Sequence, residues 1–375
     1  MSFVNHSNPV IKEILPLTGL RFIAAFYVFL FHIHIRWPLT SHVFIKNILD
    51  QGAIGMSLFF ILSGFVLVLR YGDLSHSYKN YIINRIARIY PVYIIAAVVT
   101  LPWMGIAFET NGILQIIMSV ARVSFLVGTN IFLLQAWFPQ FFTLWNDGGS
   151  WSISVEAFCY SLLPLIIARL SKLSKRQLYS VSFACYCIAV LPGLSVILFN
   201  SSSHSVFYSM PIFRLPEFVL GGCICLLSSL DMSKFAMTFK QFVVIFFFLV
   251  YLGFIGPQLP FLYVVHNWVA LPVIGFIILS LTTEKGLLTS LLSSKSLVWL
   301  GKISYGFYSF QALLILLLVT YHDRWVELFP FLSNNIILAL VSFLILTLIS
   351  AGSYYFIEEP SRHWIKKQFL KRQSN

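Results

Sequence analysis

Two ionisable side chains interrupt the first apolar segment of the sequence. Arg21 and His32 are separated by ten residues in LTGLRFIAAFYVFLFHIHI, a stretch otherwise suited to span a bilayer. An ionisable group inside hydrocarbon is costly, so such residues usually face a polar interior and mark a functional pathway. Because an imidazole exchanges protons near neutral pH, the pair predicts chemistry inside a membrane, with His32 as the reactive group.

A carboxylate is predicted at about the depth of His32, on a helix that runs in the opposite direction. The helical rise places His32 roughly 16 Å outward of Arg21, and Glu156 about one and a half turns after the start of GGSWSISVEAFCYSLLP. Trp151 at this start suits the membrane interface, and Ser152 follows it. A carboxylate beside an imidazole orients it and raises its basicity. We therefore predict His32 and Glu156 as catalytic residues; the alternative is that Glu156 only caps or pairs.

Three arginines are predicted at one level near the inner face of the membrane. Arg85 and Arg88 are three residues apart in NRIARIYPVY and share a helix face, and Arg21 lies at a similar depth. Guanidinium groups hold phosphates through forked hydrogen bonds, so the three predict a phosphate-binding site. The alternative is ordinary positive anchoring at the inner membrane surface.

Small and paired polar residues occur in two other apolar segments. Ser63 and Gly64 fall in the middle of the second segment, where small residues permit close helix packing or form the wall of a channel for a slender ligand. Arg214 and Glu217 in RLPEF are three residues apart, a spacing that allows an ion pair on one helix face. For this pair we favour a structural role.

Composition places the chain among α-helical membrane proteins. It has 375 residues, of which 58% are hydrophobic and 10% charged, whereas soluble domains carry about 25% charged residues. The apolar runs are continuous, unlike the weak alternation of a β-barrel. Despite a net charge of +12, the basic residues flank the apolar runs, so the distribution argues against nucleic-acid binding. The five cysteines lie within apolar runs without metal-ligand spacing, and we expect free thiols and no metal site.

Hydropathy and charge together predict a topology. We predict ten transmembrane helices, at about 15–36, 53–70, 89–106, 151–169, 178–198, 211–229, 241–257, 265–282, 303–320 and 334–357. With cytoplasmic termini, the outer segments hold only Arg36, Lys46, Arg122, Arg214 and Arg324 among the basic residues. Counting 113–135 as a span would destroy this asymmetry, so we expect a re-entrant or outer-surface segment there. The expected organisation is a membrane domain over 1–360 and a short basic cytoplasmic tail over 361–375.

These segments, taken in order, resemble the acyltransferase-3 family of integral membrane acyltransferases. The resemblance rests on Arg21 with His32, then SLFFILSGF, NRIARIYPVY, WSISVE, RLPEF, GKISYGFY (with Tyr305) and FIEEPSR (with Glu358), and it covers nearly the whole chain. It implies a protein of the bacterial inner membrane that takes acetyl-CoA from the cytoplasm. The acceptor would be a hydroxyl of lipopolysaccharide, O-antigen, peptidoglycan or another surface glycan, or of its lipid-linked precursor. One departure is Gln311, where many relatives have a histidine, so we do not expect proton transfer at that position.

On this resemblance, Arg21, Arg85 and Arg88 would hold the phosphates of CoA while its thin arm passes Ser63 and Gly64. His32 would then act as a general base or carry the acetyl group as an acyl-imidazole. Some relatives carry an extracytoplasmic hydrolase-like domain; here we expect direct transfer or a separate extracytoplasmic partner. Two alternatives are a flippase for a lipid-linked sugar, which would use the same charges as a path, and a glycan polymerase, disfavoured because no large polar outer loop is predicted.

Overall fold

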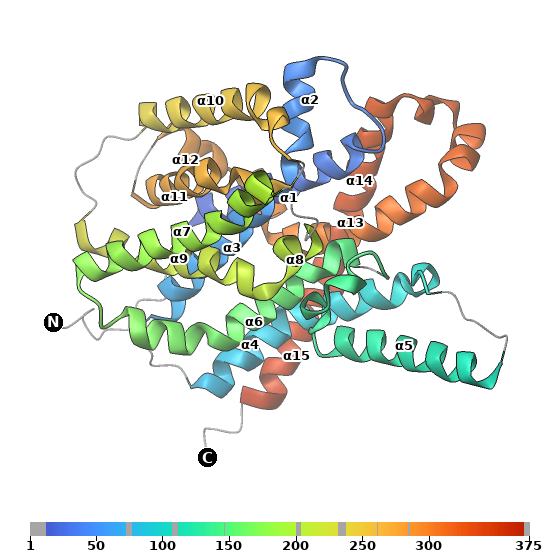
Figure 1. The fold of residues 1–375 in the computed structure, drawn as a ribbon, viewed down its shortest axis with the longest axis horizontal. Helices are drawn as coiled ribbons and strands as arrows, with labels where there is room; N and C mark the ends of the chain where they lie inside the picture. Colours follow the sequence, from blue (N-terminus) through green and yellow to red (C-terminus); the bar gives the residue numbers. More distant parts are fainter. Residues whose placement is uncertain are drawn as a thin grey trace. The chain divides into compact units, whose positions relative to one another are not determined.

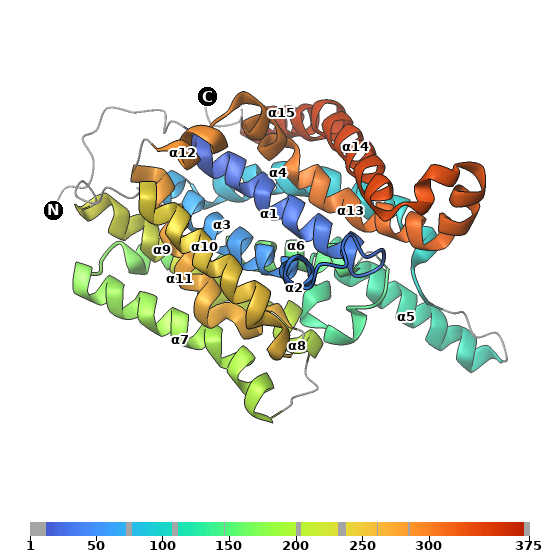
Figure 2. The same ribbon diagram turned by 90° about the horizontal axis from the view of Figure 1, so that it is seen from above.

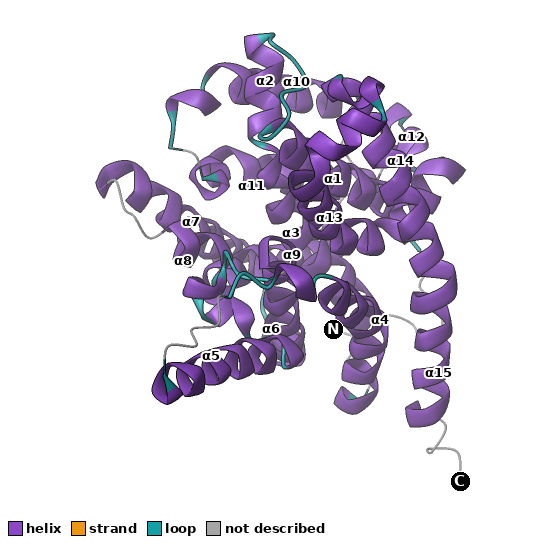
Figure 3. Ribbon diagram, turned by 90° about the vertical axis from the view of Figure 1, so that its right-hand side faces the viewer, coloured by secondary structure: helices purple, strands orange, loops and turns teal. Residues whose placement is uncertain are grey.

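The described part of the chain is built from helices. The computed structural model describes residues 13–72, 77–106, 112–145, 147–199, 204–231, 238–260, 262–283 and 286–370, and within these ranges there is no β-strand (Figure 3). A backbone in lipid must satisfy its own hydrogen bonds, and helices do so within one segment. The predicted all-α polytopic class is therefore confirmed.

The α-helices keep the labels of Figure 1 throughout. They are α1 (Leu15–His34), α2 (Val43–Asp50), α3 (Gly55–Tyr71), α4 (Tyr78–Val99), α5 (Ile113–Ile131), α6 (Asp147–Leu170), α7 (Lys175–Phe199), α8 (His204–Ser209), α9 (Pro211–Asp231), α10 (Thr238–Phe254), α11 (Asn267–Thr283), α12 (Leu287–Leu292), α13 (Lys295–Leu328), α14 (Asn335–Ser353) and α15 (Glu359–Leu370). Short 3₁₀ segments join several of them, and the segment Tyr354–Glu358 between α14 and α15 is a π-helix.

Eleven helical segments of the described ranges are long and apolar enough to cross a membrane, by length and composition. Ten correspond to the predicted spans, although several extend further. The helix predicted at 89–106 is α4, which begins at Tyr78, so Arg85 and Arg88 lie inside it. Helical hydrogen bonding continues past the apolar run because lysine and arginine are good helix formers.

The eleventh candidate is α5, which occupies the segment predicted to be re-entrant or on the outer surface. One narrow stripe of α5 is buried, at Ser119, Leu126, Thr129 and Asn130, whereas Arg122 is exposed. The helix has the length and composition of a span. Its placement in a membrane stays a prediction from charge.

The end of the chain is more helical than the predicted boundary at residue 360 implied. Helix α14 continues through the π-helix into α15, which ends at Leu370. The predicted tail of 361–375 is therefore helical as far as Leu370, and residues 371–375 lie outside the described ranges. Pro360 is the second residue of α15, in the first helical turn, where proline is tolerated.

Internal contacts divide the chain into two compact units. The first unit comprises 1–82, 161–201 and 214–304, and the second comprises 83–160, 202–213 and 305–375. The domain predicted over 1–360 includes residues of both. Helices α4, α6, α9 and α13 each contribute residues to both units.

The first unit is organised around α1 and α3, which run beside each other (Figure 2). Phe29 and Ile33 of α1 and Phe60 and Ile61 of α3 are at most 1% exposed. Helix α11 packs on α3 and α10, and α2 packs on α10. The unit thus buries the inward face of α1, the helix that carries Arg21 and His32.

A network of polar side chains in the second unit anchors the end of α5. The Tyr93 hydroxyl donates to the Asn130 carbonyl oxygen at 2.9 Å, and the Ser154 hydroxyl donates to the Leu133 carbonyl oxygen at 2.6 Å. Leu133 has φ +56°, a left-handed conformation that ends the helix. These bonds connect α4 and α6 to the residues that follow α5.

Candidate functional site

Arg21 and His32 lie on one face of α1. Eleven residues correspond to about three turns, so the two side chains project in nearly the same direction, roughly 16 Å apart along the axis. Ile23, on the opposite face, is 40% exposed, whereas Ala25 and Val28 between them are 0% and 2% exposed. The cation and the imidazole therefore share the inward face of the helix.

His32 is held through its backbone and its ring face. The Arg36 guanidinium donates to the His32 carbonyl oxygen at 3.0 Å, and the Phe31 ring centroid is 5.0 Å from that of His32. The imidazole is partly exposed, and within the described part of the first unit neither ring nitrogen has a hydrogen-bond partner. Its nitrogens are thus available to accept a proton or an acyl group.

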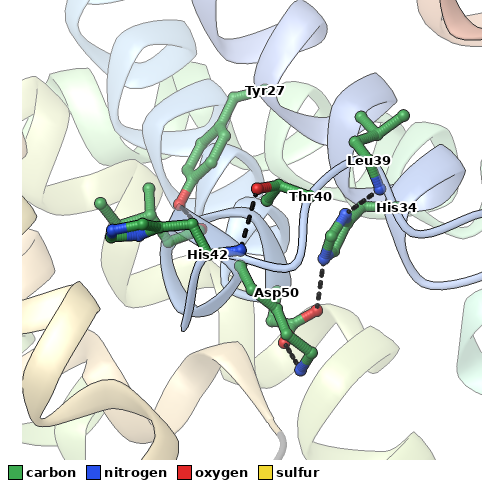
Figure 4. A network of polar contacts seen from close by, with 8 residues as sticks. Tyr27, His34, Leu39, Thr40, His42 and Asp50 are labelled. Atoms are coloured by element: carbon green, nitrogen blue, oxygen red, sulfur yellow. Dashed lines mark hydrogen bonds and ion pairs between the residues drawn. The ribbon is translucent and has the colours of Figure 1, made fainter. Parts of the chain in front are cut away.

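His34, two residues later, has a structural role that Figure 4 shows. Its Nδ1 accepts a hydrogen bond from the Leu39 backbone N–H at 2.9 Å, and its Nε2 lies 3.7 Å from Asp50 Oδ1. Asp50 also pairs with Lys46 at 2.8 Å, and the Tyr27 hydroxyl donates to the Ile48 carbonyl oxygen at 2.6 Å. The imidazole therefore fixes the segment after α1 to α2.

The structure places Gly64 at a close crossing of α3 and α9. A Cβ atom at Gly64 would collide with the Phe218 carbonyl group, and one at Gly221 would collide with the Ile61 carbonyl group. Glycine at both positions allows the two backbones to touch. Ser63, one residue before Gly64, is partly exposed. Gly64 thus serves helix packing, and a channel-wall role for either residue stays a prediction.

Arg214 and Glu217 form the ion pair that their spacing predicts. The guanidinium Nη1 is 2.7 Å from Glu217 Oε1, and both side chains are 0% exposed. The same carboxylate oxygen accepts from Ser57 at 3.3 Å and from Asn267 at 3.0 Å, while Arg214 lies over the Tyr263 ring at 5.1 Å. This cluster joins α3, α9 and α11, which supports the structural interpretation of the pair.

In the second unit, Glu156 is joined to Arg85 through a tyrosine. The Tyr160 hydroxyl donates to Glu156 Oε2 at 2.6 Å, and the Arg85 guanidinium carbon lies 5.9 Å from the Tyr160 ring centroid. Arg85 is 8% exposed and Tyr160 is 7% exposed. Arg88 is within electrostatic range of the same tyrosine. The carboxylate and both arginines of this unit therefore surround one side chain.

The remaining predicted residues of the second unit occupy its interior. Tyr305 donates to the Ile89 carbonyl oxygen at 2.6 Å and is within electrostatic range of Glu156 and Glu358. Glu358 and Gln311 are 4% and 3% exposed. These side chains therefore surround Glu156 with polar groups on α13 and at the end of α14.

Trp151 and Ser152 are also interior residues. Ser152 donates to the Tyr308 hydroxyl at 2.9 Å. Trp151, predicted for the membrane interface, is 2% exposed and packs its ring 5.0 Å from Tyr208. A tryptophan surrounded by protein does not serve as an interfacial anchor, so the expectation for Trp151 is wrong in this respect.

The structure brings together two groups of predicted residues, one in each unit. In the first unit Arg21 and His32 share a face, and in the second unit Glu156 and Arg85 share Tyr160. The predicted pairings of His32 with Glu156, and of Arg21 with the other arginines, stay predictions. Sequence reasoning missed Tyr160, although its i,i+4 spacing from Glu156 was a visible signal.

Metal binding is not indicated in the described residues. They contain no group of three or more histidine, cysteine, aspartate or glutamate side chains that could hold a metal ion. The five cysteines, all described, are free thiols, three of them buried. The site chemistry is therefore that of imidazole, carboxylate, phenol and guanidinium groups.

These observations define an integral membrane protein of many helices with ionisable groups in its interior. The chain belongs to the acyltransferase family, because the family model described as Acyltransferase domain matches residues 15–355. It is 25% identical over 380 residues to a Bacillus subtilis protein named "Putative peptidoglycan O-acetyltransferase YrhL", with 95% of this chain and 56% of the relative covered.

Two further relatives carry acyl-transfer names. The Streptomyces mycarofaciens "Acyltransferase MdmB" is 27% identical, covering 58% of this chain and 58% of the relative. A "Putative O-acetyltransferase" of Staphylococcus aureus strain COL is 23% identical, covering 92% of this chain and 57% of the relative. The chain thus spans a little over half the length of these relatives. No solved structure matches it.

Proposed function

We propose that this acyltransferase moves an acetyl group from cytoplasmic acetyl-CoA to a hydroxyl of a cell-surface polysaccharide or of its lipid-linked precursor. The observation that carries the proposal is the placement of Arg21 and His32 on one inward face of α1, in a chain that belongs to a membrane acyltransferase family. Relatives named as O-acetyltransferases, one of them of peptidoglycan, support a glycan hydroxyl as acceptor.

The donor would be bound from the inner side of a bacterial cytoplasmic membrane, with both termini in the cytoplasm. CoA carries several negative charges, and the guanidinium groups of Arg21, Arg85 and Arg88 would bind its phosphates. The thin arm of CoA would extend the thioester toward His32, roughly 16 Å outward of Arg21. Short acyl thioesters other than acetyl-CoA share this chemistry.

His32 would act on the acceptor in one of two ways. As general base, its imidazole takes the proton of the sugar hydroxyl while the oxygen attacks the thioester carbonyl carbon, and the tetrahedral intermediate expels the CoA thiolate, which takes the proton from the imidazolium. As nucleophile, the imidazole first carries the acetyl group and then releases it to the hydroxyl. Glu156 would stabilise the imidazolium or the acyl-imidazole, as an orienting carboxylate does.

The test uses purified protein in liposomes supplied with labelled acetyl-CoA and a glycan acceptor. We expect His32→Ala to lower kcat by about 100-fold or more, and Arg21→Ala to raise the donor KM by about 10-fold with a smaller change in kcat. Matched controls are His363→Ala, whose side chain is 78% exposed, and the exposed Arg176→Ala. Equal loss of donor affinity from His32→Ala and Arg21→Ala would contradict the two roles.

A cellular experiment separates the enzyme from a flippase. A His32→Ala strain that exports a normal amount of glycan without acetyl groups supports transfer, whereas blocked export would support transport of a lipid-linked sugar. Mass spectrometry of the surface glycan, with and without this protein, identifies the acceptor sugar. Transfer by the protein alone in liposomes would make a separate extracytoplasmic partner unnecessary.

A further inference from the structure

Tyr160 is the residue of the second unit that contacts both a predicted catalytic group and a predicted donor-binding group. It follows Glu156 by one helical turn on α6, so the two side chains share a face. Its hydroxyl donates to Glu156 Oε2 at 2.6 Å, a short bond to a carboxylate. Hydrogen bonds to an ionised acceptor are about twice as strong as neutral ones.

The ring of Tyr160 makes the second contact. The Arg85 guanidinium on α4 lies 5.9 Å from the ring centroid, within the range of a cation–π interaction. Both side chains are under 10% exposed, so water screens the contact little. Arg88, one turn after Arg85, is also within electrostatic range. One phenol therefore links the carboxylate of α6 to the arginine pair of α4.

We infer that Tyr160 is a positioning residue for acyl transfer, whose hydroxyl fixes the Glu156 carboxylate and whose ring fixes the Arg85 guanidinium. The inference rests on the proposed function, because it uses the roles proposed for Glu156 and Arg85. Tyr160 acts through these two groups and not on the substrate. Its two contacts are chemically distinct, so two substitutions separate them.

Tyr160→Phe removes the hydroxyl and keeps the ring. We expect kcat to fall by about 10- to 100-fold, the range for loss of a hydrogen bond to a charged group, with the donor KM within about 2-fold of the parent value. Tyr160→Leu removes both contacts. We expect it to lower kcat by a similar factor and to raise the donor KM by about 5-fold or more, because the Arg85 guanidinium loses its aromatic partner.

A double-mutant cycle tests whether the hydroxyl works through the carboxylate. In a Glu156→Gln background, Tyr160→Phe should lower kcat by no more than about 2-fold further, because the group it fixes is already altered. Tyr93→Phe is the matched control: Tyr93 is also a buried, hydrogen-bonded tyrosine of the second unit, but its hydroxyl contacts Asn130. We expect this control to leave kcat and donor KM unchanged.

The outcomes separate this inference from the proposed function. A parent protein that transfers no acetyl group refutes the proposed function. An active parent whose Tyr160→Phe variant keeps full kcat, or loses as much in the Glu156→Gln background as in the parent, overturns the inference alone. A Tyr160→Phe protein that unfolds at a temperature well below that of Tyr93→Phe would make Tyr160 a purely structural residue, which also overturns it.

Discussion

Substitution of Gly64 by alanine tests the crossing of α3 and α9 that structures the first unit. An added Cβ at Gly64 would collide with the Phe218 carbonyl oxygen and lie 2.9 Å from its carbonyl carbon and 3.3 Å from the Gly222 nitrogen. The contact is reciprocal, since a Cβ at Gly221 would lie 2.8 Å from the Ile61 carbonyl carbon. Both obstacles are helical backbone, so the helices must separate.

The free-energy change of Gly64→Ala has three parts. Overpacking of a tight contact costs about 1–3 kcal/mol. Each lost Cα–H···O contact between the backbones costs about 0.5–1 kcal/mol. Alanine restores about 1 kcal/mol through its higher helix propensity. The net expectation is a loss of about 1–3 kcal/mol in the free energy of unfolding, for Gly64→Ala and equally for Gly221→Ala.

The assay is thermal unfolding of the purified protein in detergent, together with the donor KM. Matched controls are Gly128→Ala in α5 and Gly352→Ala in α14, where an added Cβ meets nothing within 4 Å. We expect the controls to be neutral or slightly stabilising and Gly64→Ala to unfold several degrees lower. A Gly64→Ala protein as stable as the controls, with a raised donor KM, would refute the packing argument and favour a channel wall.

Three further predictions concern other contacts. His34→Ala removes the acceptor of the Leu39 N–H, so we expect faster hydrogen exchange of that amide and a loss of about 1 kcal/mol in stability; unchanged exchange would contradict it. Glu217→Gln leaves the fully buried Arg214 charge without its counter-ion, and we expect a loss of about 3–5 kcal/mol, measured as a large drop in unfolding temperature; an unfolding temperature equal to that of the parent would show that the ion pair is dispensable. Leu133→Gly relieves a left-handed backbone at φ +56°, and we expect the unfolding temperature to rise, by up to about 1 kcal/mol in free energy; a fall would show that the Leu133 side chain matters more than the strain.

The sequence by itself determined the class of the protein, the approximate spans and the residues to test. Long apolar runs can satisfy their backbone hydrogen bonds in lipid only as helices, so composition alone predicted the all-α fold. The three-residue spacing of Arg214 and Glu217 was enough to predict their ion pair, because residues three apart meet on a helix surface. The spacing of Arg21 and His32 likewise placed both on α1.

Tertiary structure decided which partners these residues have. The sequence placed Gly64 in the middle of a segment, but only the approach of α9 shows that its missing Cβ is required. It placed Trp151 at a helix start, where the interface was a reasonable expectation, yet packing against Tyr208 buries it. Tyr160 had no charge to attract attention until α4 brought the Arg85 guanidinium over its ring. Periodicity describes one helix at a time, whereas contacts between helices depend on packing that a single sequence does not encode locally.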